Sequence, residues 1–559
     1  MIRPLPKGAR RRWPVAVATA LAALVAVPAA SAHSVLIATE PAKDAVVQEA
    51  PSRVLLRFDE PVETALGSIR VFDAAGERVD AEGITRPTPR EVAVAVEGTL
   101  EQGTYTVAWR VISADSDPIR GAFVFHVGAR GAEPAGIASQ VDEGTPFIVS
   151  LFYTGGRFFE FVLLLLCAGG LAALVLALGS AAPALSARLF GILAVLGGAL
   201  TVFALLGIVF QGAAAGGFGL LEAFRWNVVS SVAETRYGEF AILRAVLGAA
   251  VALKALALSR EGGRNKALLG LALVLVAALV VTPSFSGHAR VAGPLALLAD
   301  IAHVQAAAAW TGGLAFVVLA LALARNDRWP LAARSVPRFS RMAVVSVVVL
   351  IVAGAVNGYM QIRTWRGLWE TEYGLLLLAK ISLVVPLLAL GAYNNRYAVP
   401  RLRRQIASVL EQRRFLQAAA AELTVMVAIV AVTAVLVNAP PARTELVMHG
   451  PVEEVVELGD LEVHLSVEPG MPGANEIHLT FEGQGSEAEL EEINLSASLP
   501  EEQIGPLRFA AEQIGHGGEW VAEGALLPIA GDWQLRIEAR RGEFELLTET
   551  VSIEIREES

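Results

Sequence analysis

The apolar residues of this 559-residue chain are concentrated in its middle. Eight segments there are long and apolar enough to cross a hydrocarbon layer of ~30 Å. We predict membrane helices at 149–178, 188–211, 238–258, 266–285, 296–324, 341–361, 373–394 and 420–438. The flanking regions are polar and acidic, and they alternate apolar with polar residues as β-strands do. The pattern predicts a multidomain membrane protein with an N-terminal β-sandwich, an eight-helix transmembrane α bundle and a C-terminal β-sandwich.

The start of the chain has the pattern of a secretory signal peptide. A basic segment precedes an apolar run over 15–27 and the small-residue cleavage signal Ala30-Ser31-Ala32. Cleavage after Ala32 would make His33 the first residue of the mature chain. An N-terminal histidine can chelate a metal through its α-amino nitrogen and ring Nδ1, and such donors suit Cu(II). Cleavage at another bond would leave His33 without this role, and both interpretations stay open.

The same patterns set the expected domain boundaries. They are a signal peptide over 1–32, the N-terminal β-sandwich over 33–128, a linker over 129–145, the membrane domain over 146–440 and the C-terminal β-sandwich over 441–559. Arginine and lysine are enriched in the loops after the third, fifth and seventh helices, which places those loops in the cytoplasm. An even number of helices then leaves both termini extracytoplasmic. We therefore expect a multi-pass protein of the bacterial cytoplasmic (inner) membrane.

Composition excludes several classes of function. The net charge is −10, with the carboxylates concentrated in the flanking domains, and no pattern indicates nucleic-acid binding. The single cysteine, Cys167, lies in an apolar segment, so neither a disulfide framework nor a CxxC site is expected. The sequence has no Walker A motif and no phosphorylation-type catalytic signature. We expect a protein that is not an enzyme and does not itself hydrolyse ATP.

Two histidines are expected in the outer half of the membrane domain. His288 follows the fourth predicted helix and His303 lies early in the fifth, where residues 300, 303, 307 and 310 share one helical face. Ionisable groups at this depth usually face a protein-lined interior. His288 and His303 are therefore candidate copper ligands, with Asp300 as a supporting carboxylate. The alternative is a pair of interfacial histidines that hydrogen-bond to the backbone.

Other polar or sulfur-containing residues of the membrane segments have structural or path-lining interpretations. Arg157 and Glu160 are spaced to pair with each other on the first helix. Lys380 and Glu422, in the last two helices, could line a path or pack as polar groups. Met426 could offer a thioether to Cu(I), although an isolated methionine in an apolar helix is usually core packing.

Several motifs of the N-terminal domain resemble those of the CopC family of periplasmic copper-binding proteins. They are His33, the tripeptide at 40–42 (EPA), and the runs 54–63 (VLLRFDEPVE), 105–115 (YTVAWRVISAD) and 118–125 (PIRGAFVF). The resemblance implies a Cu(II) site made of the N-terminal histidine, an aspartate, and a histidine two residues after that aspartate.

The chain departs from this expected ligand set at one position. Asp115 stands at the aspartate position, but Asp117 replaces the second histidine. A carboxylate in place of the imidazole still offers a metal ligand, but it is a harder donor and makes the site less selective for copper. We take His33, Asp115 and Asp117 as the expected metal residues, and an altered, a weakened or a lost site all stay open. His126 could substitute, but strand alternation favours an exposed surface position for it.

The membrane segments resemble the CopD family of copper-resistance membrane proteins. The matching motifs are 286–289 (SGHA), 301–304 (IAHV), 309–314 (AWTGGL), 338–340 (RFS), 373–374 (YG) with Lys380, 394–396 (NNR) and 400–402 (PRL). In the C-terminal region, the pattern over 469–475 and at 531–533 is similar to the YtkA-like domains found in CopC and CopD fusions. The whole chain thus resembles a CopC–CopD fusion, a copper-resistance or copper-import protein.

These resemblances predict that copper is bound outside the membrane and passed to the membrane domain, for import or homeostasis. The expected partners are a copper ion and the lipid bilayer, with a periplasmic copper chaperone as a further candidate and no nucleic acid. Two alternatives stay open: a non-transporting resistance protein that sequesters copper, and a membrane redox protein that binds haem or quinone. The direction of transport, its energy source and the oxidation state of copper in the membrane are not predicted.

Overall fold

The structure is a computed structural model of the chain. It describes residues 36–41, 43, 45–58, 61–64, 69–98, 100–113, 118–131, 146–179, 181–291, 293–324, 327–362, 365–439, 441–442, 452–459, 461–468, 470, 472–482, 490–502, 504–514, 519–542 and 545–555. The predicted signal peptide and most of the predicted linker lie outside these residues.

The N-terminal domain is a β-sandwich, as predicted. Its strands are β1 (Leu36–Glu40), β2 (Val46–Val47), β3 (Arg53–Phe58), β4 (Val62–Glu63), β5 (Ile69–Phe72), β6 (Asp80–Thr85), β7 (Glu91–Val96), β8 (Gly103–Ser113) and β9 (Pro118–Val127). One sheet has the order β1-β3-β7-β6 and the other β2-β9-β8-β4, with β5 also paired to β8. Side chains from both sheets meet in one core. There Phe58 packs edge-on against Trp109, with their ring centroids 5.3 Å apart.

His126 of β9 is buried, so the prediction that it is an exposed strand residue is wrong. Its Nδ1 lies 2.9 Å from the hydroxyl of Thr104, which also donates a hydrogen bond to the carbonyl of Gly131. β2 pairs alongside His126, and the chain after β9 returns over Thr104. These neighbouring segments cover a position that strand alternation alone would leave in solvent.

The helices of the membrane domain follow. They are α3 (Phe147–Leu176), α4 (Pro183–Gly216), α5 (Trp226–Ala233), α6 (Arg236–Arg260), α7 (Lys266–Ser286), α8 (His288–Val291), α9 (Pro294–Leu323), α10 (Arg328–Ile362), α11 (Glu372–Tyr393), α12 (Val399–Arg403) and α13 (Val409–Leu436), with short turns η1 (Glu222–Phe224), η3 (Arg366–Leu368) and η4 (Asn394–Ala398). Among the described residues, eight helices are long and apolar enough to cross a membrane, which confirms the predicted number.

Two of these helices begin well before their apolar segments. α10 begins at Arg328, so the arginines expected in the preceding loop lie in its first turns. α13 begins after Ser408, whose hydroxyl accepts a hydrogen bond from the backbone N–H of Glu411, while the Glu411 carboxylate accepts one from the Ser408 N–H. This capping box starts the helix in a polar segment. Hydropathy therefore locates the membrane crossing, whereas the cap locates the helix end.

Helices α3 and α9 cross with their backbones in contact. A Cβ atom on Gly169 of α3 would overlap the carbonyl oxygen of Ala308 on α9. In the same way, a Cβ atom on Gly312 of α9 would overlap the carbonyl oxygen of Leu165 on α3. Such close packing through small residues is a common way for helices to associate in a membrane. The crossing fixes the relative position of the two helices at the centre of the bundle.

The C-terminal domain is a second β structure, as predicted. Its elements are β10 (Val452–Leu458), β11 (Leu461–Glu468), β12 (Gly473–Glu482), β13 (Leu490–Leu499), η6 (Pro500–Glu502), β14 (Ile504–Ile514), β15 (Glu519–Leu527), β16 (Gly531–Arg541) and β17 (Glu545–Ile555). They form one path, β10-β11-β12-β15-β14-β13-β16-β17, and its outer strands β10 and β17 contact each other. The sheet therefore curls around a single core that contains the fully buried Trp533.

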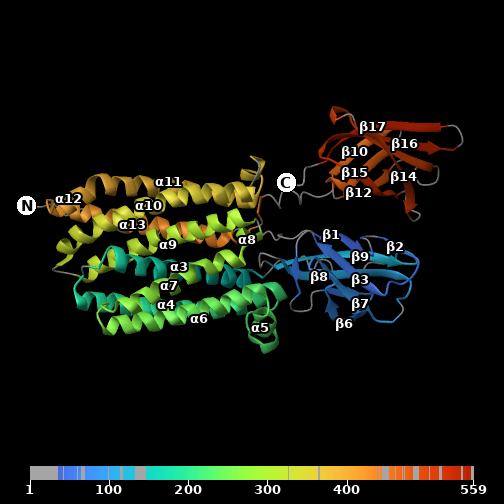
Figure 1. Cartoon of the computed structure of the whole chain (residues 1–559). Helices are drawn as coiled ribbons and strands as arrows, with labels where there is room; N and C mark the ends of the chain where they lie inside the picture. The colour runs from blue at the N-terminus through green and yellow to red at the C-terminus, as the bar shows by residue number, and fades with distance from the viewer. Residues whose placement is uncertain are drawn as a thin grey trace, which may run out of the picture.

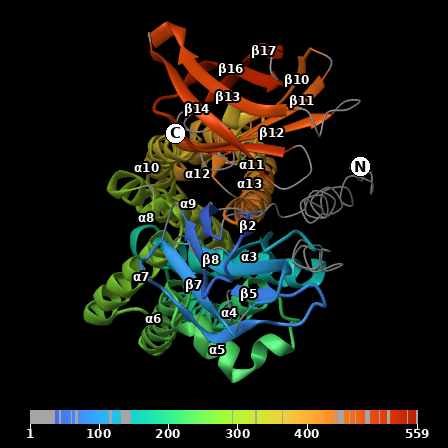
Figure 2. The same ribbon diagram turned by 90° about the vertical axis from the view of Figure 1, so that its right-hand side faces the viewer.

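Both β domains lie at the same end of the helix bundle, which we call the domain end (Figure 1). A second view shows the N-terminal domain over the side of the bundle formed by α3, α4 and α6, and the C-terminal domain over the side formed by α10 and α11 (Figure 2). The position of both domains at one end agrees with the even number of membrane helices.

The N-terminal domain contacts the membrane domain through charged groups at two helix ends. The carboxylate of Glu63 accepts hydrogen bonds of 3.2 and 3.3 Å from the backbone N–H of Arg236, where α6 begins. The guanidinium of Arg110 lies against Gly217, the left-handed residue (φ 66°) that ends α4. A helix has partial positive charge at its N-terminus and partial negative charge at its C-terminus. Each side chain thus meets a helix end of opposite sign.

Burial raises the pKa of Glu63 above its ordinary value of 4.5; Arg86 opposes this rise and Glu239 adds to it. The cost of removing the carboxylate from water therefore exceeds the gain from its cationic surroundings. The docked state consequently binds a proton at Glu63 more readily than the undocked state does.

The α3–α9 crossing predicts that Gly312→Ala destabilises the membrane domain. The added methyl group has no space beside the Leu165 carbonyl, and overpacking of this kind lowers the free energy of unfolding by about 1 to 3 kcal/mol. Thermal unfolding of the detergent-solubilised protein measures the effect. Gly198→Ala on α4 is the matched control, because no atom lies within 4 Å of the point where its Cβ atom would stand. Equal unfolding temperatures for the two variants would contradict the close crossing.

Docking of the N-terminal domain is predicted to strengthen on acidification. Since the docked pKa of Glu63 is raised, its contribution is fully present below pH ~4.5 and is lost as the pH rises through the docked value. Glu63→Gln keeps an acceptor oxygen without a charge, so its docking should be independent of pH in this range. Spin labels at Glu77→Cys and Asn227→Cys, both exposed, allow the docked fraction to be measured by pulsed EPR. A docked fraction that increases with pH would disprove this prediction.

Candidate functional site

The membrane domain encloses a cavity of about 970 Å³. Its wall is formed by residues of α3, α6, α7, α9, α10, α11 and α13, and most of these residues are apolar. At the domain end the lining includes Gly287, Ala289 and Trp365, so the cavity reaches the end of the bundle where the β domains lie. On α3 and α9 the lining extends no further than Leu165 and Thr311, where these two helices cross. The crossing therefore forms the inner limit of the cavity.

His303 presents an unpaired nitrogen inside this cavity. Its Nδ1 is buried and has no hydrogen-bond partner among the described residues. The ring lies beside the backbone of Leu350 on α10. A Cβ atom on Gly354 would stand 3.4 Å from Nδ1, so glycine at this position leaves the edge of the ring uncrowded. A buried imidazole nitrogen without a partner is costly, and a metal ion that it could coordinate would remove that cost.

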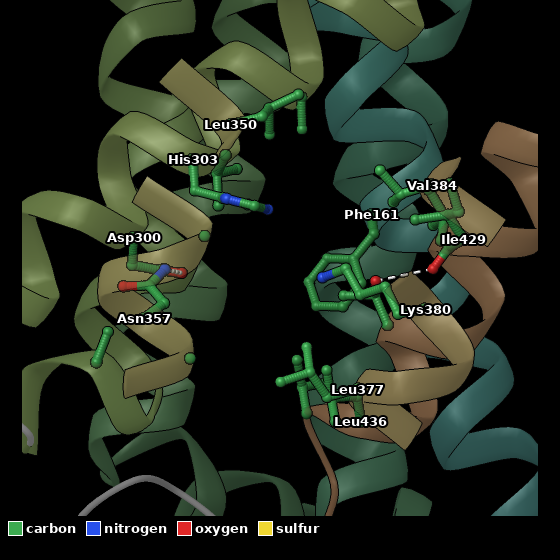
Figure 3. A pocket seen from close by; sticks show the side chains of 18 of the residues that line it. Phe161, Asp300, His303, Leu350, Asn357, Leu377, Lys380, Val384, Ile429 and Leu436 are labelled. Carbon is green, nitrogen blue, oxygen red and sulfur yellow. Dashed lines mark hydrogen bonds between the residues drawn. The ribbon is translucent and has the colours of Figure 1, made fainter. Parts of the chain in front are cut away.

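Charged and amide groups surround His303. Asp300, one helical turn before it on α9, accepts a hydrogen bond of 3.3 Å from the side-chain amide of Asn357 on α10. Lys380 on α11 interacts electrostatically with both Asp300 and His303. Figure 3 shows Asp300, His303 and Asn357 on one wall of the cavity and Lys380 on the other. The four side chains form a polar group, here called the His303 cluster, within a mostly apolar cavity.

The helical-face prediction for α9 is confirmed. Asp300, His303, Ala307 and Trp310 all line the cavity. Two further members of the site, Asn357 and Gly354, were not predicted from the sequence. A signal was available for Asn357, because an amide within an apolar membrane helix is costly and usually faces a protein interior. The position of Gly354 beside His303 depends on how α9 packs against α10, which periodicity does not reveal.

The predicted pairing of Arg157 with Glu160 is wrong. Glu160 forms a buried ion pair with Arg244 of α6, and Arg244 also donates a hydrogen bond of 2.9 Å to Thr282 of α7. Arg157 instead donates to Asn438 beyond α13, at 2.7 Å, and to Tyr153. Both residues thus join different helices. Cross-helix partners satisfy these charges because the cost of an unpaired ion in the bundle is large.

Glu422, Lys380 and Met426, in the last two membrane helices, have separate environments. The carboxylate of Glu422 accepts a hydrogen bond of 2.5 Å from Asn394, which agrees with the interpretation of Glu422 as a packing group. Lys380 and Met426 both line the cavity, which agrees with a path-lining position for Lys380. Met426 is buried there, so a thioether role for it stays a prediction.

The remaining predicted metal residues are not tested by the structure. His33, Asp115 and Asp117 lie outside the described residues, although Ser113 and Pro118 on either side of the aspartates are described. The backbone of His288 begins α8 beside the cavity-lining Gly287 and Ala289, but its side chain is not described. Within the described part of the chain, no group of three or more His, Cys, Asp or Glu side chains is placed to hold a metal ion. These ligand assignments stay predictions.

Comparison with known protein families identifies three matching regions. The CopC domain model matches residues 36–128, the model for the N-terminal domain of copper resistance protein D-like proteins matches 148–297, and the copper resistance protein D model matches 333–436. The first region is the N-terminal β-sandwich, and the other two cover most of the helix bundle. The resemblance of the C-terminal domain to YtkA-like domains stays a prediction.

Individual relatives support the same assignment. The chain is 29% identical over 487 residues to the copper transport protein CutJ of Bacillus subtilis, covering 84% of this chain and 85% of that protein. It is 32% identical over 102 residues to protein YobA of Escherichia coli K12, covering 18% of this chain and 82% of YobA. It is 28% identical over 114 residues to copper resistance protein C of Xanthomonas campestris pv. juglandis, covering 19% of this chain and 89% of that protein. The chain therefore belongs to the CopC family through its N-terminal domain, and in the same polypeptide it carries membrane regions that match the copper resistance protein D models.

Proposed function

We propose that this protein binds copper outside the cytoplasmic membrane and passes it through the membrane domain for import into the cell. The observation that carries the proposal is the buried, unpaired Nδ1 of His303 in a cavity of about 970 Å³. An imidazole nitrogen is a suitable ligand for copper, and Asp300 supplies a carboxylate one turn away. The copper transport protein CutJ, similar over most of its length, supports transport as the use of this cavity.

The N-terminal domain is the proposed copper donor. We assign its Cu(II) site to His33, Asp115 and Asp117. Ser113, the last described residue before the two aspartates, pairs with Val62, which is next to the docking residue Glu63. Covalent linkage keeps donor and acceptor at an effective concentration of order mM for a short flexible linker. Transfer then needs no diffusion of free copper.

The domain end is extracytoplasmic, the signal peptide ends at Ala32, and a periplasmic copper chaperone can load the N-terminal domain. The arginine-rich loops at the other end support this orientation. The protein acts by binding and conducting an ion and not as an enzyme. A protein that only sequesters copper would bind the ion in the same places without moving it across the membrane.

Removal of the imidazole in the cavity is expected to impair transport strongly. His303→Ala should reduce the uptake of radioactive copper into proteoliposomes about tenfold or more, since loss of a metal-site group typically costs at least this much. His464→Ala, on an exposed strand of the C-terminal domain, is the matched control and should transport normally. Wild-type uptake no greater than in empty vesicles, with copper still bound, would favour sequestration over import.

The N-terminal site has its own test in metal analysis of the full chain. His33→Ala should remove one copper ion per chain, and N-terminal sequencing should show cleavage after Ala32. Asp117→His should increase affinity for Cu(II), because an imidazole is a better copper ligand than a carboxylate. An unchanged copper content in His33→Ala would exclude the proposed chelate.

A further inference from the structure

Lys380 faces the two groups that the proposed function assigns to copper. It extends from α11 toward the cavity, and both Asp300 and His303 of α9 are within its electrostatic range. A copper ion bound at His303 would therefore meet a second positive charge in the same low-dielectric space. Two cations cannot share such a site without strong repulsion. Copper binding therefore requires the lysine to move away or to lose its proton.

The other cations of the cavity are held in place by specific partners. Arg244 is paired with Glu160 and bonded to Thr282. Arg157 is bonded to Asn438 and Tyr153. Lys380, by contrast, makes no hydrogen bond and no ion pair within 4 Å among the described residues. Its ammonium, on a flexible four-carbon stem, lies across the cavity from Asp300 and interacts with it through charge alone.

We propose that Lys380 is a tethered cation that competes with copper for the His303 cluster. In the copper-free cavity its ammonium neutralises Asp300, and copper displaces it by binding Asp300 and His303 together. When copper leaves, Lys380 returns and prevents the same ion from rebinding. This inference rests on the proposed function, because it assumes that copper enters the cavity.

The competition also gives selectivity. An ion such as Mg²⁺ gains only the carboxylate of Asp300, and carboxylate oxygens are its preferred ligands. It must displace an ammonium that already neutralises this carboxylate, so its net gain is small. Copper gains the unpaired Nδ1 of His303 in addition. Because each ion must displace the lysine, only an ion that also binds the imidazole of His303 gains enough free energy to bind.

The test measures copper binding by the full chain, with His33→Ala in every sample to remove the proposed N-terminal site. Cu(I) is supplied at free concentrations set by a competing chelator. Lys380→Gln should bind copper about tenfold more tightly, because a like charge is removed from the same low-dielectric cavity. It should also transport more slowly in proteoliposomes, since release is no longer assisted. Millimolar Mg²⁺ should reduce the copper affinity of the Lys380→Gln variant. It should leave the copper affinity of the protein with Lys380 unchanged.

Two variants control for structural effects. Lys380→Arg keeps the charge and should bind copper as the lysine form does. Lys254→Gln removes a lysine of α6 that does not line the cavity and should change nothing. Lys380→Gln protein that is monodisperse but binds copper no more tightly than the lysine form would overturn the inference.

The proposed function fails by a different result. If His303→Ala in the same background binds and transports copper normally, copper does not use this cavity. Both the proposed function and the proposed role of Lys380 are then disproved. If His303→Ala loses copper while Lys380→Gln binds it with unchanged affinity, the cavity remains the copper path and only the role of Lys380 is excluded.

Discussion

The backbone contact between α3 and α9 at Gly169 and Gly312 determines the shape of the membrane domain. From this contact the two helices continue toward the domain end, where residues 157–165 of α3 and 300–311 of α9 line the cavity. His303 lies nine residues before Gly312, or about 14 Å along the helix at 1.5 Å per residue. The crossing thus closes the cavity at one end and sets the depth at which the imidazole is held.

The cavity combines two properties that depend on each other. Its wall is mostly apolar, so the few charged groups inside it interact strongly, and each has a counter-charge or a hydrogen-bond partner nearby. Glu160 and Arg244 neutralise each other beside one wall, whereas Asp300 and Lys380 face each other across the space. The first arrangement joins α3 to α6 and stabilises the bundle. The second leaves charges that a ligand ion can rearrange.

Sequence patterns predicted the features that depend on a single element. The eight membrane helices, the β domains on either side and the cavity-facing stripe at 300, 303, 307 and 310 all follow from local periodicity. Patterns failed where two elements meet. Arg157 is a possible partner for Glu160 three residues away on the same helix, but Glu160 pairs with Arg244 of another helix. His126 is covered by β2 and by the chain that follows β9. Such choices depend on packing distances that no local pattern contains.

The two β domains lie over different halves of the helix bundle. The N-terminal domain is attached through Glu63 and Arg110 to the ends of α6 and α4, and the C-terminal domain lies over α10 and α11 (Figure 2). A rocking motion of the α3–α7 half against the α10–α13 half would carry the N-terminal domain with the first half. Because the Gly169–Gly312 contact has no side chain that could rotate away, opening the inner end of the cavity would require such a rigid-body movement of whole helices. The orientation of the N-terminal domain relative to the α10–α13 half would then report whether the inner end of the cavity is open.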